Sequence, residues 1–283
     1  MQSQSSGGSS LPNIRASMLP GFLDCSRRAA AQQWREQIQS KGYTLRKTNS
    51  SVGAAIGTAF HRSVAELLRR KQETERAGFK YQDVTEARDL GMESLIESLK
   101  HGVEWDATSK TVKDAEQHLD RFLLASVPHI LGCTPEHVEI KVTAPLVDPL
   151  TGEVIAELSG HFDDLEITEF LWDWKTASRE PSPQAQIGLY SLVGNACGLK
   201  IRGGGFLWLK RGSLNKPQEN PITKIFDLIE CERLAYRAAL AAGRQYQEFE
   251  ITGDIHVFPA NPVSQMCSAL YCSAHSTDAC SFG

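Results

Sequence analysis

The sequence predicts a single α/β domain, and three observations lead to this prediction. Segments with helical spacing of apolar residues dominate the first half of the chain. Short alternating segments, rich in β-branched and aromatic residues, follow from residue 137. A helix, further strands and a last long helix complete the chain, in an order that is not a βαβ repeat. The 283 residues are enough to bury a large core.

Four helices are expected before the strands. The first covers residues 19–39, with Asp24 as a cap and Cys25 near its start. The second, "VGAAIGTAFHRSVAELLRR", has apolar residues at helical spacing: Ile56, Phe60, Val64 and Leu67. The other two are expected over residues 84–102 and 110–131. The polar residues 1–10 read as a flexible tail.

The second half alternates strands with two helices. Strands are expected over residues 137–148, 153–168 and 169–176, with turns at "DPLTGE" and near Thr168. A helix over 182–197 follows, then strands over 201–211 and 222–229, and a helix over 230–250. The final 30 or so residues contain three cysteines and no periodic pattern.

Composition excludes some classes of protein. No apolar run approaches the length of a membrane span, and the first residues lack the pattern of a secretory signal. We therefore expect a cytoplasmic protein, in the host cytoplasm if phage-encoded, where cysteines bind metals more often than they form disulfides. The net charge of −4 offers no global attraction for nucleic acid. The basic segment 25–47, which includes Arg27 and Arg28, either follows DNA phosphates or is a solvated helix face.

The densest chemistry lies in "GHFDDLEITEFLWDWKTA". If Thr168 is at the turn, Asp163 and Asp173 are five residues to either side and fall opposite each other. Asp173 and Lys175 share a strand face, because side chains alternate along a strand. Two close carboxylates repel unless a cation lies between them, and oxygen ligands suit Mg²⁺ or Mn²⁺. The alternative is a solvated hairpin with an Asp–Lys ion pair.

Four short motifs in this order resemble the RecB-like branch of the PD-(D/E)XK nucleases. They are Gly57-x-x-x-His61, Gly160-x-x-Asp163, Asp173-x-Lys175 and Gln186-x-x-x-Tyr190. The resemblance extends over nearly the whole chain from Leu11. It implies a mixed central sheet flanked by helices, and a nuclease that hydrolyses DNA with the help of a divalent metal.

The resemblance also implies roles for individual residues. His61, Asp163 and Asp173 would bind the metal, together with the backbone carbonyl of Trp174, and Lys175 would position the attacking water. Glu139 matches an acidic position on the first core strand and would join the catalytic set, with Glu136 as a nearby competitor. Two side chains on the following helix would hold a DNA phosphate or the Lys175 strand, unless they only pack the helix: Gln186 and Tyr190.

Some members of this branch carry an iron–sulfur cluster bound by one cysteine before the core and three after it. The matching residues here are Cys25, Cys267, Cys272 and Cys280. The resemblance favours [4Fe–4S], and zinc is the alternative, with His275 able to replace one thiolate. The remaining cysteines are expected to be buried small apolar residues: Cys133, Cys197 and Cys231.

Together these observations predict one nuclease domain over residues 11–283, with a core of about 50–250 and a cysteine module from 20–48 and 251–283. The expected activity is that of a DNA exonuclease in recombination, phage replication or CRISPR adaptation. Its substrate would be single-stranded DNA or DNA with ends, and a recombination or adaptation protein is a possible partner. The alternatives are a catalytically inactive DNA-binding or adaptor subunit and a zinc-stapled structural protein.

Overall fold

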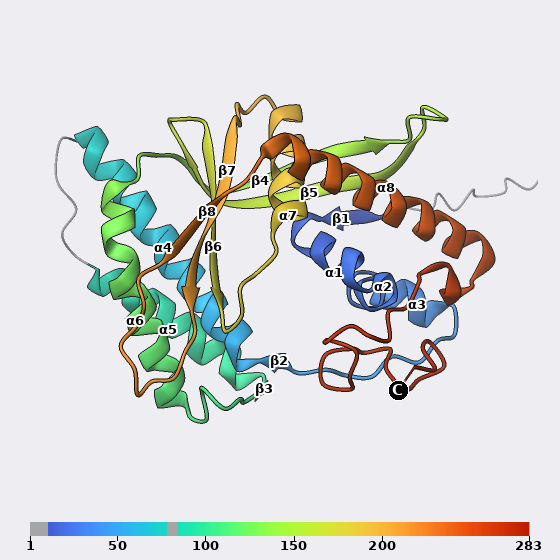
Figure 1. The fold of residues 1–283 in the computed structure, drawn as a ribbon, viewed down its shortest axis with the longest axis horizontal. Helices are drawn as coiled ribbons and strands as arrows, with labels where there is room; N and C mark the ends of the chain where they lie inside the picture. Colours follow the sequence, from blue (N-terminus) through green and yellow to red (C-terminus); the bar gives the residue numbers. More distant parts are fainter. Residues whose placement is uncertain (1–10, 78–83, 283) are drawn as a thin grey trace, which may run out of the picture.

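The computed structural model describes residues 11–77 and 84–282, and in it a mixed sheet lies between two groups of helices (Figure 1). The helices are α1 (Leu19–Asp24), α2 (Ser26–Gln33), α3 (Arg35–Ser40), α4 (Val52–Ala77), α5 (Thr85–Lys100), α6 (Val112–Gly132), α7 (Gln184–Ala196) and α8 (Leu228–Thr252). The strands are β1 (Asn13–Arg15), β2 (Ser50–Ser51), β3 (Val103–Glu104), β4 (Pro135–Val147), β5 (Val154–Glu166), β6 (Phe170–Ala177), β7 (Gly203–Lys210) and β8 (Ile222–Ile225). The predicted α/β class and helix-flanked mixed sheet are thus confirmed.

The sheet is organised around β5. One edge of β5 pairs antiparallel with β4. On the other edge, β1 pairs in parallel with residues 157–159, and β6 pairs antiparallel with Asp164 and Leu165. Within the described chain, residues 160–163 therefore have no strand partner on that edge. The sheet continues through β7, parallel to β6, and β8, antiparallel to β7.

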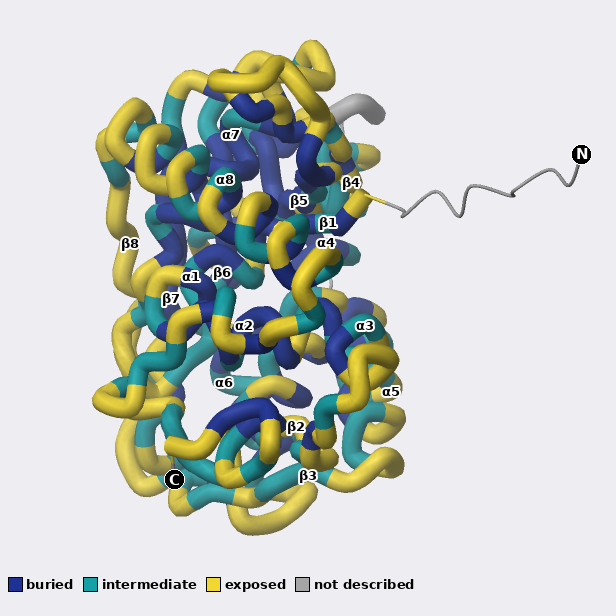
Figure 2. The backbone as a smooth tube through the Cα atoms, turned by 90° about the vertical axis from the view of Figure 1, so that its right-hand side faces the viewer, coloured by how far each residue is buried: buried dark blue, intermediate teal, exposed yellow. Residues whose placement is uncertain are grey.

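Two apolar cores cover the two faces of the sheet. The stripe predicted on α4 is buried, and Ile56, Phe60 and Leu67 are fully inaccessible. This stripe packs with α5, α6 and Trp174 of β6. The other core contains α7, α8 and the N-terminal helices. Figure 2 shows that α7 and the central strands are buried beneath a partly exposed α8. No helix in the described residues has both the length and the apolar character needed to cross a membrane.

The N-terminal segment differs from the single helix expected over 19–39. Cys25 has an extended backbone with φ −149°, which separates α1 from α2, and Trp34 separates α2 from α3. Trp34 packs on the rings of Phe22, Tyr246 and Phe258, so tertiary contacts favour the interruption. Asp24, expected to cap the helix, is the last residue of α1, and its carboxylate accepts from Arg28 and Ser264.

Three very short strands were not predicted, because a strand of two or three residues has no detectable alternation. These strands, β1, β2 and β3, are defined only by their partners across the sheets. At the other end of the chain, the expected strand over 222–229 stops at Ile225, since Asp227 caps α8 by accepting from the Glu230 N–H. The remaining predicted helices and strands are present with small shifts of their ends, except that α4 continues seven residues beyond the expected end, to Ala77.

The contact between α7 and α8 depends on a glycine. A Cβ atom on Gly188 would lie 2.0 Å from the carbonyl oxygen of Cys231, which is backbone and cannot rotate away. We expect Gly188→Ala to lower the free energy of unfolding by about 1–3 kcal/mol through overpacking, although alanine is the better helix former. Gly132→Ala is the control, because a Cβ there meets nothing within 4 Å. Urea unfolding measures both variants, and equal midpoints would contradict the close approach.

Candidate active site

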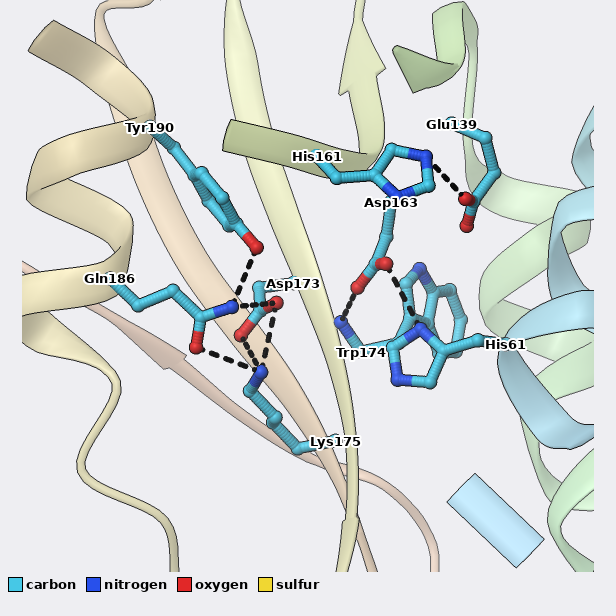
Figure 3. A network of polar contacts seen from close by, with 9 residues as sticks. All are labelled: His61, Glu139, His161, Asp163, Asp173, Trp174, Lys175, Gln186 and Tyr190. Carbon is cyan, nitrogen blue, oxygen red and sulfur yellow. Dashed lines mark hydrogen bonds and ion pairs between the residues drawn. The ribbon is translucent and has the colours of Figure 1, made fainter. Parts of the chain in front are cut away.

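The predicted residues lie at the point where β5 and β6 separate. The strand register pairs Asp164 with Trp172, and its continuation by one residue sets Asp163 opposite Asp173, as expected from a turn at Thr168. α4 contributes His61, and α7 contributes Gln186 and Tyr190 (Figure 3). All of these side chains point toward one another in Figure 3.

Asp163 connects three elements. One carboxylate oxygen, Oδ2, accepts the backbone N–H of Trp174 at 2.8 Å. The other, Oδ1, lies 2.9 Å from Nδ1 of His61. Burial opposes ionisation of both groups, but their mutual attraction is stronger, so the pKa of Asp163 is lowered and that of His61 is raised. Because an ionised carboxylate can only accept, the hydrogen of this contact lies on His61 Nδ1, which donates to Asp163.

Asp173 holds Lys175 in place. Lys175 Nζ lies 2.8 Å from Asp173 Oδ2 and donates to Gln186 Oε1 at 3.1 Å. Gln186 in turn donates to the Tyr190 hydroxyl at 2.6 Å. Burial raises the pKa of Asp173 to about 6, although the Lys175 charge opposes this. Of the two roles predicted for Gln186, these contacts correspond to holding the Lys175 strand.

A second pair, Glu139 and His161, borders this network. Their side chains form an ion-pair contact of 2.7 Å between Glu139 Oε2 and His161 Nε2. Glu139 has a left-handed backbone with φ 54°, so the strand is locally irregular where its side chain enters the site. His161 was missed at the sequence level. It is a variable position of Gly-x-x-Asp, and its partner on β4 is 22 residues away, so only the strand pairing brings them together.

One group of side chains has the spacing of a metal site. Single ligand atoms of His61, Glu139 and Asp163 all lie within 4.8 Å of one another. Glu136, the competitor of Glu139, is outside this group. So is Asp173, because its carboxylate is turned to Lys175. The structure therefore brings together two of the three predicted ligand side chains, His61 and Asp163, and Glu139, predicted as catalytic, takes the place of Asp173 in the compact set.

A wide cleft lies over the site and is lined by basic side chains. Exposed Arg62 and Arg69 border it from α4, where a spacing of seven residues places them on one face. Arg179 follows β6 and hydrogen-bonds Gln265 of the C-terminal segment. Arg211 is only 8% exposed and is neutralised by Asp106 at 2.6 Å. These arginines were not predicted from the sequence, although the seven-residue spacing of Arg62 and Arg69 beside His61 is visible there.

Three arginines of the basic segment 25–47 make contacts within the fold, whereas Lys41, Arg46 and Lys47 are exposed. Arg27 is 4% exposed, and its guanidinium donates to the Phe258 carbonyl and contacts His256. Arg28 pairs with Asp24 at 2.8 Å. Arg35 donates to two backbone carbonyls. Arg27 thus joins the N-terminal helices to residues 256–258 and is buried away from any DNA, whereas a DNA-binding role for Arg28 and the rest of the segment stays a prediction.

The four cysteines assigned to a metal cluster line one small cavity, together with His275. Cys25 accepts a hydrogen bond from the Asn261 N–H at 3.4 Å, although the two are 236 residues apart. The other three cysteines differ in their exposure to solvent. Cys133 and Cys231 are buried as expected, but Cys197 is exposed, because it follows the end of α7 at the surface.

Comparison with known proteins identifies one family. A model of the PD-(D/E)XK nuclease superfamily matches residues 15–277. A solved structure from Eubacterium rectale, named "Putative exonuclease", is 9% identical with a TM-score of 0.48, covering 95% of this chain and 92% of that one. The structure of SSO0001 is 12% identical with a TM-score of 0.26, covering 77% and 92%. At these TM-scores neither structural similarity supports a conclusion about function. No protein of curated function matches the sequence.

The family match includes β5, β6 and α7, which carry the polar network, and it also includes the C-terminal coil residues that line the cleft, Gln265, Met266 and Tyr271. Since it covers far more than half of the sequence, this chain belongs to the PD-(D/E)XK nuclease superfamily.

Proposed function

We propose that this nuclease is a metal-dependent deoxyribonuclease of the RecB-like branch, which acts as an exonuclease in DNA recombination, phage replication or CRISPR adaptation. The observation that carries the proposal is the meeting of Asp163, Asp173 and Lys175 on the floor of a cleft bordered by Arg62 and Arg69. Carboxylates suit a divalent metal, and the arginines suit a phosphate backbone.

The ligand atoms present fit a divalent cation. Burial and the charge of Asp163 raise the pKa of Glu139, so these two carboxylates repel each other in the absence of a cation. We assign His61, Glu139 and Asp163 as ligands, with Asp173 and the Trp174 carbonyl completing the set. A bound Mg²⁺ or Mn²⁺ would supply polarisation of the scissile phosphate and a water of lowered pKa.

Lys175 supplies the positive charge of the chain itself. Its ammonium is held from two sides by Asp173 and Gln186, and its side chain remains 23% exposed to the cleft. An ammonium in this position can orient the attacking water and offset the charge that develops on the phosphate. Tyr190 acts indirectly, because its hydroxyl accepts the Gln186 hydrogen bond and so keeps that amide directed at Lys175.

The central test is cleavage of end-labelled DNA. We expect Asp173→Ala and Lys175→Ala each to reduce Mg²⁺- or Mn²⁺-dependent cleavage by at least about 10²-fold, because each removes charge from the reacting region. Lys210→Ala is the control, since Lys210 is an exposed strand lysine outside the cleft lining. Folding is checked by thermal unfolding. Wild-type protein without cleavage would favour an inactive DNA-binding subunit, and full activity in a folded Lys175→Ala would remove the proposed role.

The DNA path is proposed to follow α4. Arg62 and Arg69 should each contact a phosphate, so Arg62→Ala/Arg69→Ala should weaken DNA binding and make the salt dependence shallower by about 1–2 in slope. Lys113→Ala/Arg237→Ala is the charge-matched control, because both side chains are exposed on other helices. Fluorescence anisotropy over a range of salt concentrations measures the slope. An unchanged slope in the Arg62/Arg69 variant would assign these charges to a solvated face.

We also propose that Cys25, Cys267, Cys272 and Cys280 bind a [4Fe–4S] cluster in a module made of residues 20–48 and 251–283. Hydrogen bonds already join the two segments: the Arg46 N–H donates to the Ser273 carbonyl, and the Thr44 N–H to Asp278. The resemblance to iron–sulfur members of the branch favours the [4Fe–4S] centre, and zinc is the alternative.

The cluster has a visible signature. Protein purified without oxygen should be brown, contain iron and acid-labile sulfide, and unfold at a lower temperature when any one of the four cysteines is replaced by serine. Cys197→Ser, an exposed cysteine outside the cavity, should change neither colour nor unfolding temperature. Colourless protein with one equivalent of zinc would replace the iron–sulfur assignment. Colourless protein without any bound metal would contradict the module.

A further inference from the structure

A second group of potential ligands lies outside the active site. Cys133 directly follows α6, while Asp164 and Glu166 lie at the end of β5. The pairing of β4 with β5 brings the three together, since Pro135 is opposite Glu166 and Val138 is opposite Asp164. One ligand atom of each lies within 4.8 Å of the others. None of these residues has a role in the nuclease site proposed above.

Asp164 is the residue that requires an explanation. Its side chain is fully buried, and neither carboxylate oxygen has a hydrogen-bond partner within the described chain. The other buried aspartates are compensated: Asp148 accepts two hydrogen bonds from Arg244, and Asp173 is paired with Lys175. Burying a carboxylate without a partner costs several kcal/mol or more. The polar groups gathered around Asp164 are the Cys133 thiol, a weak donor, and the Glu166 carboxylate, which repels it.

We propose that Cys133, Asp164 and Glu166 form a binding site for a divalent cation of the zinc type. A thiolate with two carboxylates suits Zn²⁺, which accepts sulfur and oxygen ligands, and disfavours Mg²⁺, which prefers oxygen alone. Three protein ligands leave a coordination position for water. Binding displaces the thiol proton and any proton on Asp164, and these protons go to solvent.

A buried ammonium interacts with the site. Lys71 is 6% exposed, and its Nζ donates to the carbonyl oxygen of Leu131 at 2.6 Å, two residues before Cys133. The Glu166 side chain is partly exposed, so the site can exchange ions with solvent, and Thr168 donates to its Oε2 at 3.1 Å. The site would hold the end of α6 to the hairpin that carries Asp163.

The test is the zinc content of full-length variants, measured after saturation with zinc and dialysis. Cys133→Ser and Asp164→Asn should each carry one zinc per chain fewer than the wild type. Cys231→Ser is the matched control, because Cys231 is equally buried but belongs to no ligand group. The C-terminal cysteines are intact in every protein. Any metal that they bind therefore contributes equally to each sample and does not affect the difference in zinc content between variant and wild type. Equal zinc content in folded Cys133→Ser and wild type would overturn the proposal.

A second variant keeps the proposal testable if these buried substitutions unfold the protein. Glu166→Gln changes a partly exposed side chain, and it should lose the part of the zinc-induced rise in unfolding temperature that depends on this site. Magnesium should produce no such rise at this site in the wild type. If zinc stabilises Glu166→Gln as much as wild type, the three side chains do not form a cation site, and Asp164 is buried as the neutral acid.

Discussion

The separation of β5 from β6 at Asp163 is the constraint on which the site depends. Strand pairing ends after Asp164 and Trp172, and Asp163 Oδ2 accepts the Trp174 N–H that has lost its place in the ladder. The backbone N–H of Trp174 is therefore satisfied despite the opening. The second oxygen of the same carboxylate contacts His61 and so connects α4 to the sheet. One side chain thus connects three elements, α4, β5 and β6.

The network is a costly way to stabilise a core. Buried ion pairs contribute little net stability, and well-packed apolar residues of similar volume often do better. The pKa values of Asp163 and Asp173 are also shifted in opposite directions. Burial raises the pKa of both carboxyls, but His61, the Lys175 charge and the Trp174 N–H together lower that of Asp163, whereas that of Asp173 stays raised, at about 6. Neighbouring carboxylates with separated pKa values are typical of sites that carry out chemistry. This contrast supports a functional reading of the hairpin over that of a solvated ion pair.

The C-terminal segment belongs to both the fold and the cleft. Residues 261–280 contact the N-terminal helices through Asp24 and Cys25, more than 230 positions earlier in the chain. The same segment contributes Gln265, Met266 and Tyr271 to the lining of the cleft. Figure 1 shows this coil beside the connection that leads to β2. Because loop-closure entropy grows only slowly with length, a few strong contacts suffice to hold such distant segments together. The cysteines are therefore well placed to stabilise one wall of the cleft.

The sequence by itself determined the helices with strong apolar periodicity, the turn at Thr168 and the facing of Asp163 and Asp173, because these depend on local spacing. Only the tertiary structure decided that Cys25 interrupts the first helix, that Arg27 is buried against Phe258, and that Glu139 contacts His161. It also separated Asp173 from the compact ligand group and gathered Cys133 with Asp164. These outcomes depend on partners 20 to more than 200 residues away. Periodicity reports which face of an element is buried, but the partner across that face is chosen by the packing of the whole chain.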